Sequence, residues 1–331
     1  MHCELVIPGL FSAPAEARLP SLELLLARGR ARSGESQPLE RWLAEAFGLE
    51  DEPVAAGALT ALAGNRDPGE ERWVRADPVH LRLMRDRLIL VPAAAFGVSR
   101  EEAEALCETL NEHFAGRLDI LPVQPQRWSA RLQMELEVSA SSPFDMAGRE
   151  LQVPLPGDAL LNEAQMVLHE HPVNEAREAR GEPAVNSLWL WGAGRVPLKT
   201  QSRWQSVAAD DPLAVGLARV AGARQRGRPA SAAAWLERLP EDGRHLVVLD
   251  ELRVEPEKAE MLERGWFTPL LAALRSAATC AASGAGRRRS GITREDRRAD
   301  LFRSGPPRAA GGRRASAARA HLRRAAHRLG G

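Results

Sequence analysis

The composition of the chain changes abruptly at Ser276, and this change limits where a folded core can lie. From Ser276 to Gly331 the 331-residue sequence contains 14 arginines, no lysine and 3 acidic residues, a net charge of +11. Large apolar residues are sparse there, and no helical or strand period is visible. Such a segment buries too little apolar surface to offset its ordering entropy, about 1–2 kcal/mol per residue for the backbone alone. We therefore expect a disordered basic tail at 276–331 and a folded core within residues 1–275.

The folded part carries the opposite charge. Of the 45 basic and 44 acidic residues in the chain, 31 and 41 fall within residues 1–275, a net charge of −10. An acidic body of this size repels a phosphate backbone, so binding of nucleic acid would depend on the tail. The tail lacks the interleaved aromatic residues on which single-strand binders stack bases. Nucleic acid is therefore not the partner that the sequence favours.

Two further classes of protein are excluded by simple counts. The three cysteines, Cys3, Cys107 and Cys280, lie far apart and are odd in number, which argues against a disulfide scaffold or a thiolate zinc site. No apolar run approaches the roughly 20 residues needed to span a membrane. The start of the chain has no basic residues before its apolar stretch, and Pro8-Gly9 interrupts that stretch, unlike in a secretory signal. We expect a cytoplasmic protein with no membrane partner.

Apolar periodicity predicts an α/β core. Short buried strands are expected at Leu5–Ile7, Ser187–Trp191 and His245–Leu249, with helices between them and a closing helix over 257–274. Strands that alternate with helices are typical of a parallel sheet. The sequence thus predicts a parallel-sheet core.

A smaller unit interrupts this core in the sequence. Ser99 and Glu102 have the spacing of a capping box before a helical run, and residues 128–138 alternate between apolar and polar in the manner of a half-buried strand. A helix followed by such strands predicts an inserted α+β domain at 91–156. The core is then discontinuous, formed by residues 1–90 and 157–275.

A helix with two arginines on one face is the first candidate for function. Pro172 can begin a helix in which Asn174, Arg177 and Arg180 follow at a spacing of three. Two arginines on one face can hold a phosphate or a carboxylate. The alternative is a solvated face on which the arginines pair with the glutamates at 175 and 178.

The residues on both sides of this helix are also polar. His171 precedes it, and Asn186 opens the strand that ends in Gly192-Ala193-Gly194. Ligands in open α/β sheets bind at the carboxyl ends of strands. We therefore add His171 and Asn186 to the candidate ligand-binding residues.

A second candidate group is Arg75, Asp77 and His80. An aspartate and a histidine three residues apart can act as an acid–base pair or as metal ligands. The alternative is structural: Asp77 caps a helix that begins at Pro78, with His80 in its first turn. The sequence contains no nucleophile elbow, no phosphate-binding loop and no His-Glu-x-x-His zinc motif.

Several of these motifs carry a family resemblance. The run from His171 to Pro197, with its His-Pro-Val-Asn start and its Gly-Ala-Gly end, resembles archaeal-type cofactor-independent phosphoglycerate mutases. The motifs Leu5–Leu10, Arg75–Leu81 and Asn186–Gly192 are closer still to the proteobacterial RpfE-type regulatory proteins, often labelled phosphoglycerate mutase. The resemblance covers about residues 5–275. It implies an alkaline-phosphatase-like α/β core with an inserted domain.

The chain departs from the mutases at the residues that would carry their chemistry. The resemblance implies two divalent metals, Mn or Zn, and a serine that is transiently phosphorylated. The first predicted strand ends in Ile7-Pro8-Gly9 instead of an aspartate, and the stretch 53–64, where the serine is expected, contains no serine. At the corresponding place stand Ala55, Ala56 and Gly57, with Thr60 further on. For the late metal-binding cluster that the resemblance implies, the last predicted strand offers His245 and Asp250.

These observations predict a phosphoglycerate-mutase-like regulatory protein without catalytic residues or a metal site. Its predicted ligand is a small phosphorylated or carboxylate compound, and a protein partner is the other possibility. The candidate ligand-binding residues are Arg75, Asp77, His80, His171, Asn174, Arg177 and Asn186. The alternative is an active metal-dependent mutase or phosphatase. For the tail, our hypothesis is a reading-frame shift near codon 276, and the alternative is a genuine tail.

Overall fold

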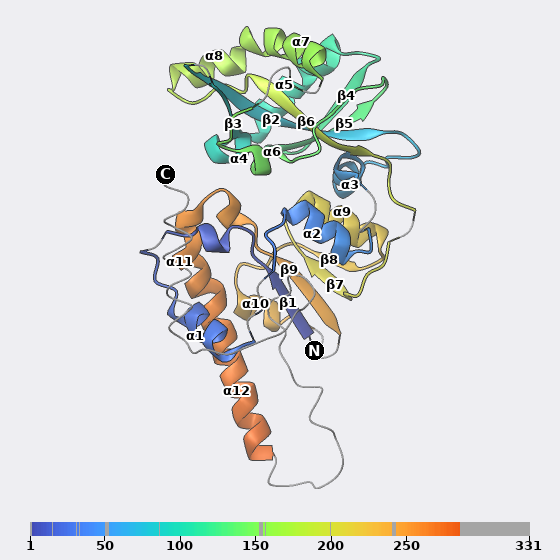
Figure 1. Ribbon diagram of the computed structural model, residues 1–331. Coiled ribbons are helices and arrows are strands. Elements are labelled where there is room, and N and C mark those ends of the chain that lie inside the picture. The colour runs from blue at the N-terminus through green and yellow to red at the C-terminus, as the bar shows by residue number, and fades with distance from the viewer. Residues whose placement is uncertain are drawn as a thin grey trace. The chain divides into compact units, whose positions relative to one another are not determined.

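A computed structural model describes residues 2–284 apart from positions 15, 31, 33, 50–52, 86, 152–154, 156, 199 and 240–242 (Figure 1). The chain forms two compact units. Of the described residues, the parallel unit contains those in 2–36, 204–209 and 226–284, and the antiparallel unit contains those in 37–203 and 210–225. Among the described residues, no helix has the length and apolar character needed to cross a membrane.

The parallel unit is built on a four-stranded sheet with the order β1-β9-β7-β8. Its strands β1 (His2–Val6), β7 (Ser206–Ala208) and β9 (Arg244–Val248) lie in this unit. The edge strand β8 (Arg224–Arg226) has only its last residue in it. Both β1 and β7 pair with β9 in parallel. Residues 245–248 are fully buried, because a parallel sheet is covered on both faces. The parallel sheet predicted from the first and last apolar runs is confirmed.

Helices cover this sheet. They are α1 (Pro20–Arg28), α10 (Ala232–Leu236), α11 (Ala259–Leu262) and α12 (Thr268–Gly284), with a π-helical segment at Glu263–Phe267 and 3₁₀ turns at Leu10–Ser12, Glu251–Arg253 and Pro256–Lys258. Glu263 is buried, and its carboxylate accepts hydrogen bonds from the N–H groups of Ser21 (2.7 Å) and Leu22 (3.2 Å). These two donors lie in the first turn of α1 and have no partner within that helix. A side chain 242 residues away therefore caps α1.

The antiparallel unit contains a five-stranded sheet arranged around β2 (Trp73–Met84). The other strands are β3 (Arg87–Pro92), β4 (Leu118–Gln124), β5 (Arg127–Leu132) and β6 (Ser187–Gly194). The helices of the unit are α2 (Leu39–Ala46), α3 (Ala56–Ala63), α4 (Ala93–Phe96), α5 (Arg100–His113), α6 (Pro143–Met146), α7 (Asp158–His169), α8 (Pro172–Ala179) and α9 (Pro212–Val220). The predicted capping box at the start of α5 is present, with Ser99 and Glu102 bonded reciprocally.

The pairing of β2 explains how a proline fits within it. One edge of β2 pairs with β6 along residues 73–79. The other edge pairs with β5 at residues 73–75 and with β3 at residues 79–84, so residues 76–78 have no strand partner on that side. Pro78, which has no N–H to donate, falls in this gap.

Helix α3 lies unusually close to the backbone of β2. A Cβ atom on Gly57 would stand 2.4 Å from the backbone of Val74, and one on Gly216 of α9 would stand 2.2 Å from the carbonyl oxygen of Leu59. Real Cβ atoms do not approach so closely, so both positions need glycine. The hydroxyl of Ser129 on β5 donates to the carbonyl oxygen of Gly57 at 2.7 Å, which adds a polar contact at the same place.

The structure corrects two expectations about the fold. The strand at 187–194 pairs antiparallel with β2 instead of joining the parallel sheet. The insertion that we expected at 91–156 falls within the antiparallel unit, which comprises residues 37–203 and 210–225. Helix α12 continues to Gly284, past the boundary predicted at 276, because alanines follow that position. The disorder expected for 285–331 lies outside the described residues.

Candidate ligand-binding site

Arg75 and Asp77 form a buried ion pair in the middle of the antiparallel sheet. Their side chains are each 3% exposed. The Asp77 carboxylate accepts bonds from the Arg75 guanidinium (2.5 Å), from the Trp128 N–H (3.1 Å) and from the indole Nε1 of Trp191 (2.7 Å). The guanidinium also donates to the Trp128 carbonyl (3.1 Å) and to the Thr60 hydroxyl (3.3 Å), and lies over the Trp191 ring. Both charges are therefore fully engaged inside the protein.

The position of Asp77 bears on the two interpretations of residues 75–80, a chemical pair of Asp77 and His80 or a helix capped by Asp77. Asp77 lies within strand β2, so the alternative in which it caps a helix is wrong. The aspartate instead fills the gap between β5 and β3, where it bonds the otherwise unpaired N–H of Trp128. Sequence reasoning did not connect Thr60, Trp128 and Trp191 with this pair, since no local spacing signals a contact between a strand and a separate helix or strand.

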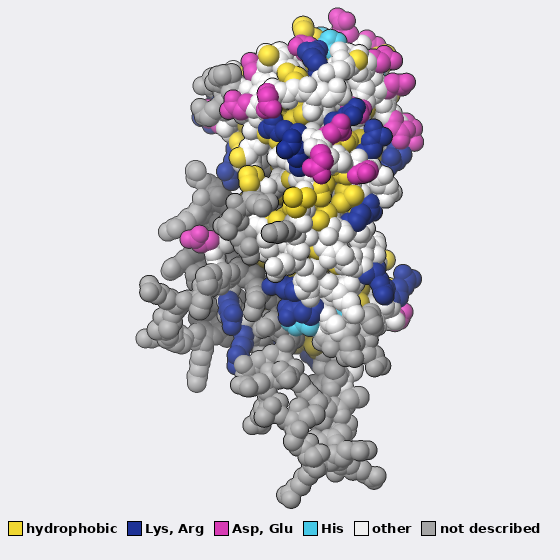
Figure 2. Space-filling view, turned by 90° about the vertical axis from the view of Figure 1, so that its right-hand side faces the viewer, with side chains coloured by type: hydrophobic (Ala, Val, Ile, Leu, Met, Phe, Trp, Pro, Cys, Tyr) yellow, Lys and Arg dark blue, Asp and Glu magenta, His cyan; other side chains and the backbone are white. Residues whose placement is uncertain are grey.

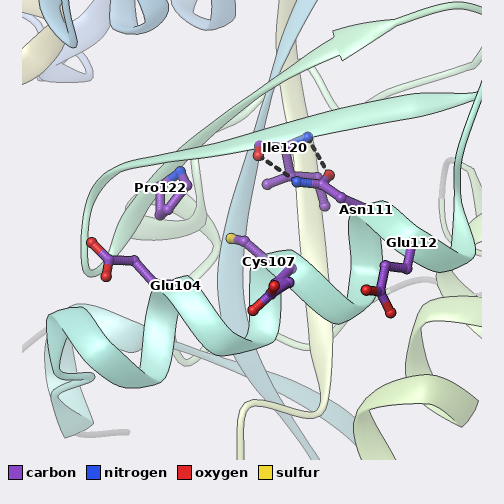
Figure 3. A pocket seen from close by; sticks show the side chains of 7 residues that line it. Glu104, Cys107, Asn111, Glu112, Ile120 and Pro122 are labelled. Atoms are coloured by element: carbon purple, nitrogen blue, oxygen red, sulfur yellow. Dashed lines mark hydrogen bonds between the residues drawn. The ribbon is translucent and has the colours of Figure 1, made fainter.

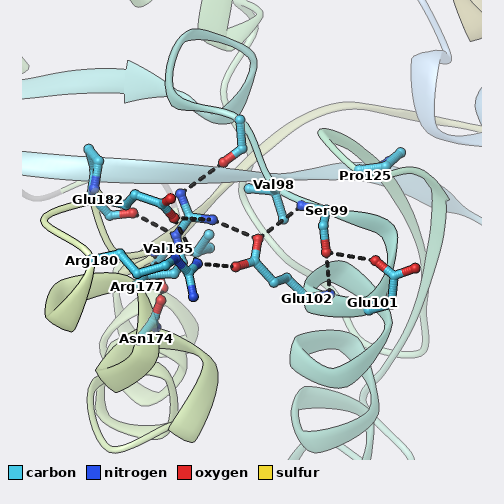
Figure 4. Close-up of polar contacts among 12 residues, drawn as sticks. Val98, Ser99, Glu101, Glu102, Pro125, Asn174, Arg177, Arg180, Glu182 and Val185 are labelled. Atoms are coloured by element: carbon cyan, nitrogen blue, oxygen red, sulfur yellow. Dashed lines mark hydrogen bonds and ion pairs between the residues drawn. The ribbon is translucent and has the colours of Figure 1, made fainter.

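Arg177 is the centre of a second buried network (Figure 4). Its side chain is 2% exposed. The guanidinium donates to the Glu102 carboxylate (2.6 Å), to the Gly97 carbonyl (2.8 Å) and to the Pro183 carbonyl (2.8 Å), and it lies over the Phe96 ring. The network connects α8 to the start of α5.

The partners of both arginines differ from those we weighed. Arg180, which is 49% exposed, pairs with Glu102 and Glu182 at 2.7 Å each. The pairing with the glutamates at 175 and 178 is therefore wrong. The sequence pattern indicates Glu102 only as part of the cap of α5, whereas in the structure its carboxylate also bonds Arg177 and Arg180.

Two asparagines bond the backbone as a neighbouring strand would. Asn174 bonds both the N–H and the C=O of Val185 at 2.8 Å, and its amide also donates to the Leu168 carbonyl. Asn186 bonds both the N–H (2.7 Å) and the C=O (2.9 Å) of Leu81. The amide groups are used in the fold, at the place where β6 begins.

The two candidate histidines also hold backbone groups. His171 is the N-cap of α8: its Nδ1 accepts from the Val173 N–H (3.1 Å), and its Nε2 bonds the Thr109 hydroxyl (3.1 Å). Burial lowers the pKa of His171, and a hydrogen bond to the Ala105 backbone opposes this shift. His80 donates from Nδ1 to the Ala184 carbonyl at 2.9 Å.

The structure thus brings five of the seven predicted residues to one end of the antiparallel sheet. His80, His171, Asn174, Arg177 and Asn186 lie where α8 leads into β6 beside β2, and the Arg75–Asp77 pair lies further along β2. We expected all seven around one cleft. The hydrogen bonds described above tie the polar groups of these seven side chains to other parts of the protein.

A shallow hollow of about 570 Å³ lies elsewhere, on α5 (Figure 3). It is lined by Glu104, Cys107, Glu108, Asn111, Glu112, Ile120 and Pro122. Asn111 bonds both the N–H (2.6 Å) and the C=O (2.9 Å) of Ile120, and so closes the outer edge of β4. None of the seven predicted residues lines this hollow.

The described residues do not fit the two-metal site that the resemblance implies. They contain no group of three or more His, Cys, Asp or Glu side chains arranged to hold a metal ion. Of the two residues left from the late cluster, His245 is fully buried, and its Nδ1 bonds the Ser206 hydroxyl at 2.8 Å.

Comparisons with known proteins point to one group of relatives. No family model matches the chain. The 2,3-bisphosphoglycerate-independent phosphoglycerate mutase of Methanosarcina barkeri is 32% identical over 116 residues, which are 32% of this chain and 29% of that protein. The enzyme of the same name from Methanosarcina mazei is 26% identical over 202 residues, 55% of this chain and 49% of the relative. A probable mutase from Geobacter sulfurreducens is 26% identical over 156 residues, 44% of this chain and 38% of the relative.

The matched regions therefore span half or less of these relatives. A solved structure, the PH0037 protein from Pyrococcus horikoshii, covers 80% of this chain and 75% of its own with 18% identity and a TM-score of 0.50. This likeness concerns the fold. The homologues are cofactor-independent phosphoglycerate mutases at modest identity, and the fold is mixed α/β with a parallel sheet.

Proposed function

We propose that the chain is a phosphoglycerate-mutase-like regulatory protein of the RpfE type that has lost catalysis and binds a small anionic ligand or a protein partner. The parallel unit would be the remnant of an alkaline-phosphatase-like core, and the protein would act in the cytoplasm. The homology to named mutases supports the family, and the departures at the chemical positions support the loss of activity.

The observation that carries this proposal is that helix α3 offers no accessible hydroxyl group. The resemblance places the phosphorylated serine near its start, where the chain has alanines and Gly57. The one hydroxyl on this helix belongs to Thr60, which is fully buried and accepts a hydrogen bond from Arg75. A nucleophile must reach its substrate, and this hydroxyl is enclosed by the protein.

The carboxyl end of β1 supports the same conclusion. In the mutases a metal-binding aspartate is implied there, and this chain continues with Ile7, Pro8 and Gly9. Divalent metals of this kind require carboxylate or imidazole ligands. We therefore assign no reaction step to a metal.

The proposed ligand region is the end of the antiparallel sheet that gathers His80, His171, Asn174, Arg177 and Asn186. Most polar atoms of these five side chains already form hydrogen bonds within the protein, so a ligand would contact the side chains that reach the surface. His80 and Asn186 are half-buried, and the neighbouring Arg180 is 49% exposed. A carboxylate or phosphate could pair with this arginine.

Three measurements on the purified protein test the proposal. After loading with manganese and zinc and then desalting, elemental analysis should find no stoichiometric metal, and an assay with 3-phosphoglycerate should detect no mutase turnover. Retained metal together with turnover would establish the active enzyme instead. Thermal shifts with 2- and 3-phosphoglycerate should be positive for the wild type and smaller for Arg180→Ala. Flat curves for both proteins would refute a phosphoglycerate-like ligand.

A further inference from the structure

The hairpin formed by β2 and β3 leaves one backbone edge open at Leu83. Residues 79–84 of β2 pair with residues 87–92 of β3. The N–H and C=O of Leu81 bond the Asn186 side chain, on the edge away from β3. Because outward groups recur at every second residue of an antiparallel strand, those of Leu83 point to the same open edge. No described residue pairs with Leu83 there.

The reason that β6 does not cover this edge lies in Asn174. In the register of β2 and β6, Ser187 pairs with Val79, so a longer β6 would place Val185 opposite Leu81. Asn174 already holds both backbone groups of Val185. Val185 therefore does not extend β6 along β2, and the Asn186 side chain covers this edge of β2 only as far as Leu81.

The side chains at the open end are apolar and basic. Leu83 is 72% exposed and Met84 is 49% exposed. Arg82, Arg85 and Arg87 are exposed around them. The six residues 82–87 include three arginines and one aspartate. Arg87 forms an ion pair with Glu150 at 3.7 Å, so the positive charge offered by the tip rests on Arg82 and Arg85, within a body that is acidic overall.

The apolar side chains lie mainly on one face of the hairpin. Leu81 and Leu83 share this face with Leu88 and Leu90, because they are cross-strand pairs at alternate positions. Leu90 is buried, whereas Leu81 and Leu88 are half-buried. The result is a short leucine face that continues from the core onto the exposed tip.

We propose that this edge, named here the Leu83 edge and formed by residues 81–85, 87 and 88, binds an extended acidic peptide segment of a protein partner. The segment would add a strand next to β2, pair with the backbone of Leu83, lay its apolar side chains on the leucine face and place its carboxylates near Arg82 and Arg85. Strand addition to an exposed edge is a common mode of peptide recognition. A second copy of this hairpin is disfavoured because it would bring like charges together.

This inference rests on the partner-binding part of the proposed function. It does not depend on whether the protein binds a small anion or a metal, because those questions are answered by thermal shifts and by elemental analysis. A peptide result and a phosphoglycerate result can therefore fail separately.

The probe is a fluorescein-labelled peptide of four Glu-Leu repeats, whose leucines all lie on one face when it is extended. Fluorescence anisotropy should show binding to the full chain, weakening as salt rises. A Lys-Leu peptide of the same length should not bind. Failure of the Glu-Leu peptide to bind, or equal binding of both peptides, would overturn the proposal.

Variants of the edge make the test specific. Leu83→Ser removes the apolar side chain and should weaken binding about tenfold. Leu83→Pro also removes the outward N–H, which no bond to β3 uses, and should weaken binding further. Arg82→Glu together with Arg85→Glu should weaken binding at least about tenfold.

Leu198→Ser is the matched control, since Leu198 is 93% exposed and lies outside the hairpin. It should bind as the wild type does. Wild-type affinity of Leu83→Ser, with an unchanged thermal melt, would contradict the proposal. Binding to phosphatidylserine vesicles without binding to the peptide would replace a protein partner with a lipid surface, and so would also overturn it.

Discussion

Arg177 and Glu102 join helices α8 and α5 through a hydrogen bond of 2.6 Å between Nη1 and Oε2, although the two residues are 75 positions apart in the sequence. The same carboxylate accepts the backbone N–H of Ser99 and a bond from Arg180. Glu102 therefore caps α5 and at the same time holds α8 beside it. Arginines that sequence spacing presents as a binding face are here used to connect two helices.

We expect Arg177→Ala to destabilise the antiparallel unit strongly. The change leaves Glu102 with the exposed Arg180 as its ion partner and removes the donors to the Gly97 and Pro183 carbonyls. Breaking a buried charged network of this kind costs about 3–5 kcal/mol. Arg180→Ala is the matched control, because its side chain is 49% exposed and an exposed pair contributes about 1 kcal/mol or less. Urea unfolding followed by tryptophan fluorescence measures both. Equal midpoints for the two variants would show that the Arg177 network is not structural.

The pair Arg75 and Asp77 gives a second prediction. Asp77→Ala should cost about 3–5 kcal/mol, since the guanidinium stays buried without a counter-charge. Adding Arg75→Met should recover part of this loss, because no uncompensated charge then remains in the sheet. The free energies of the two single variants and the double variant form a double-mutant cycle. Losses that simply add would contradict the coupling.

His171 predicts a pH dependence of stability. Its pKa is lowered in the folded state by burial, so the unfolded chain binds a proton more readily. The stabilisation is complete above the ordinary value of about 6.5 and is lost as the pH falls below it toward the lower folded pKa. Protonation of Nδ1 would also remove the acceptor that caps Val173.

The measurement is the thermal midpoint between pH 7.5 and pH 5. His171→Asn keeps a side chain that can cap the helix but removes the titrating group. Its midpoint should fall less than that of the wild type below pH 6.5. Parallel pH curves for the two proteins would assign the acid sensitivity to other groups.

Glu263 predicts a local effect on α1. Glu263→Ala removes the acceptor for Ser21 and Leu22, and loss of such a cap costs about 0.5–2 kcal/mol. Amide hydrogen exchange of residues 20–28 should become faster. Glu260→Ala is the control, since Glu260 bonds the exposed Arg18 N–H at 3.2 Å and not α1 itself. Unchanged exchange in α1 after Glu263→Ala would show that the cap has no stabilising role.

The sequence predicted local elements more accurately than it predicted their partners. The strand at 187–191 and the capping box at Ser99 are both present, since they depend on nearby residues. The sheet to which β6 belongs depends on its pairing with β2, more than 100 residues away, and apolar periodicity does not encode that choice.

The same limit applies to the candidate site. The sequence identified Asn174, Arg177 and Asn186 as unusual, and the structure places them together. It could not show that their polar groups bond the backbone at Val185, Pro183 and Leu81, because these contacts follow from the tertiary fold. A buried structural arginine and a ligand-binding arginine look alike in a sequence.

The close packing of α3 against β2 limits what position 57 can hold. Gly57 has no room for any side chain next to Val74, so no nucleophilic side chain can be introduced there without moving a strand. A substitution at this position would therefore disturb the sheet before its side chain could reach a substrate. Position 57 is closed to protein engineering for as long as the backbone of β2 keeps its place.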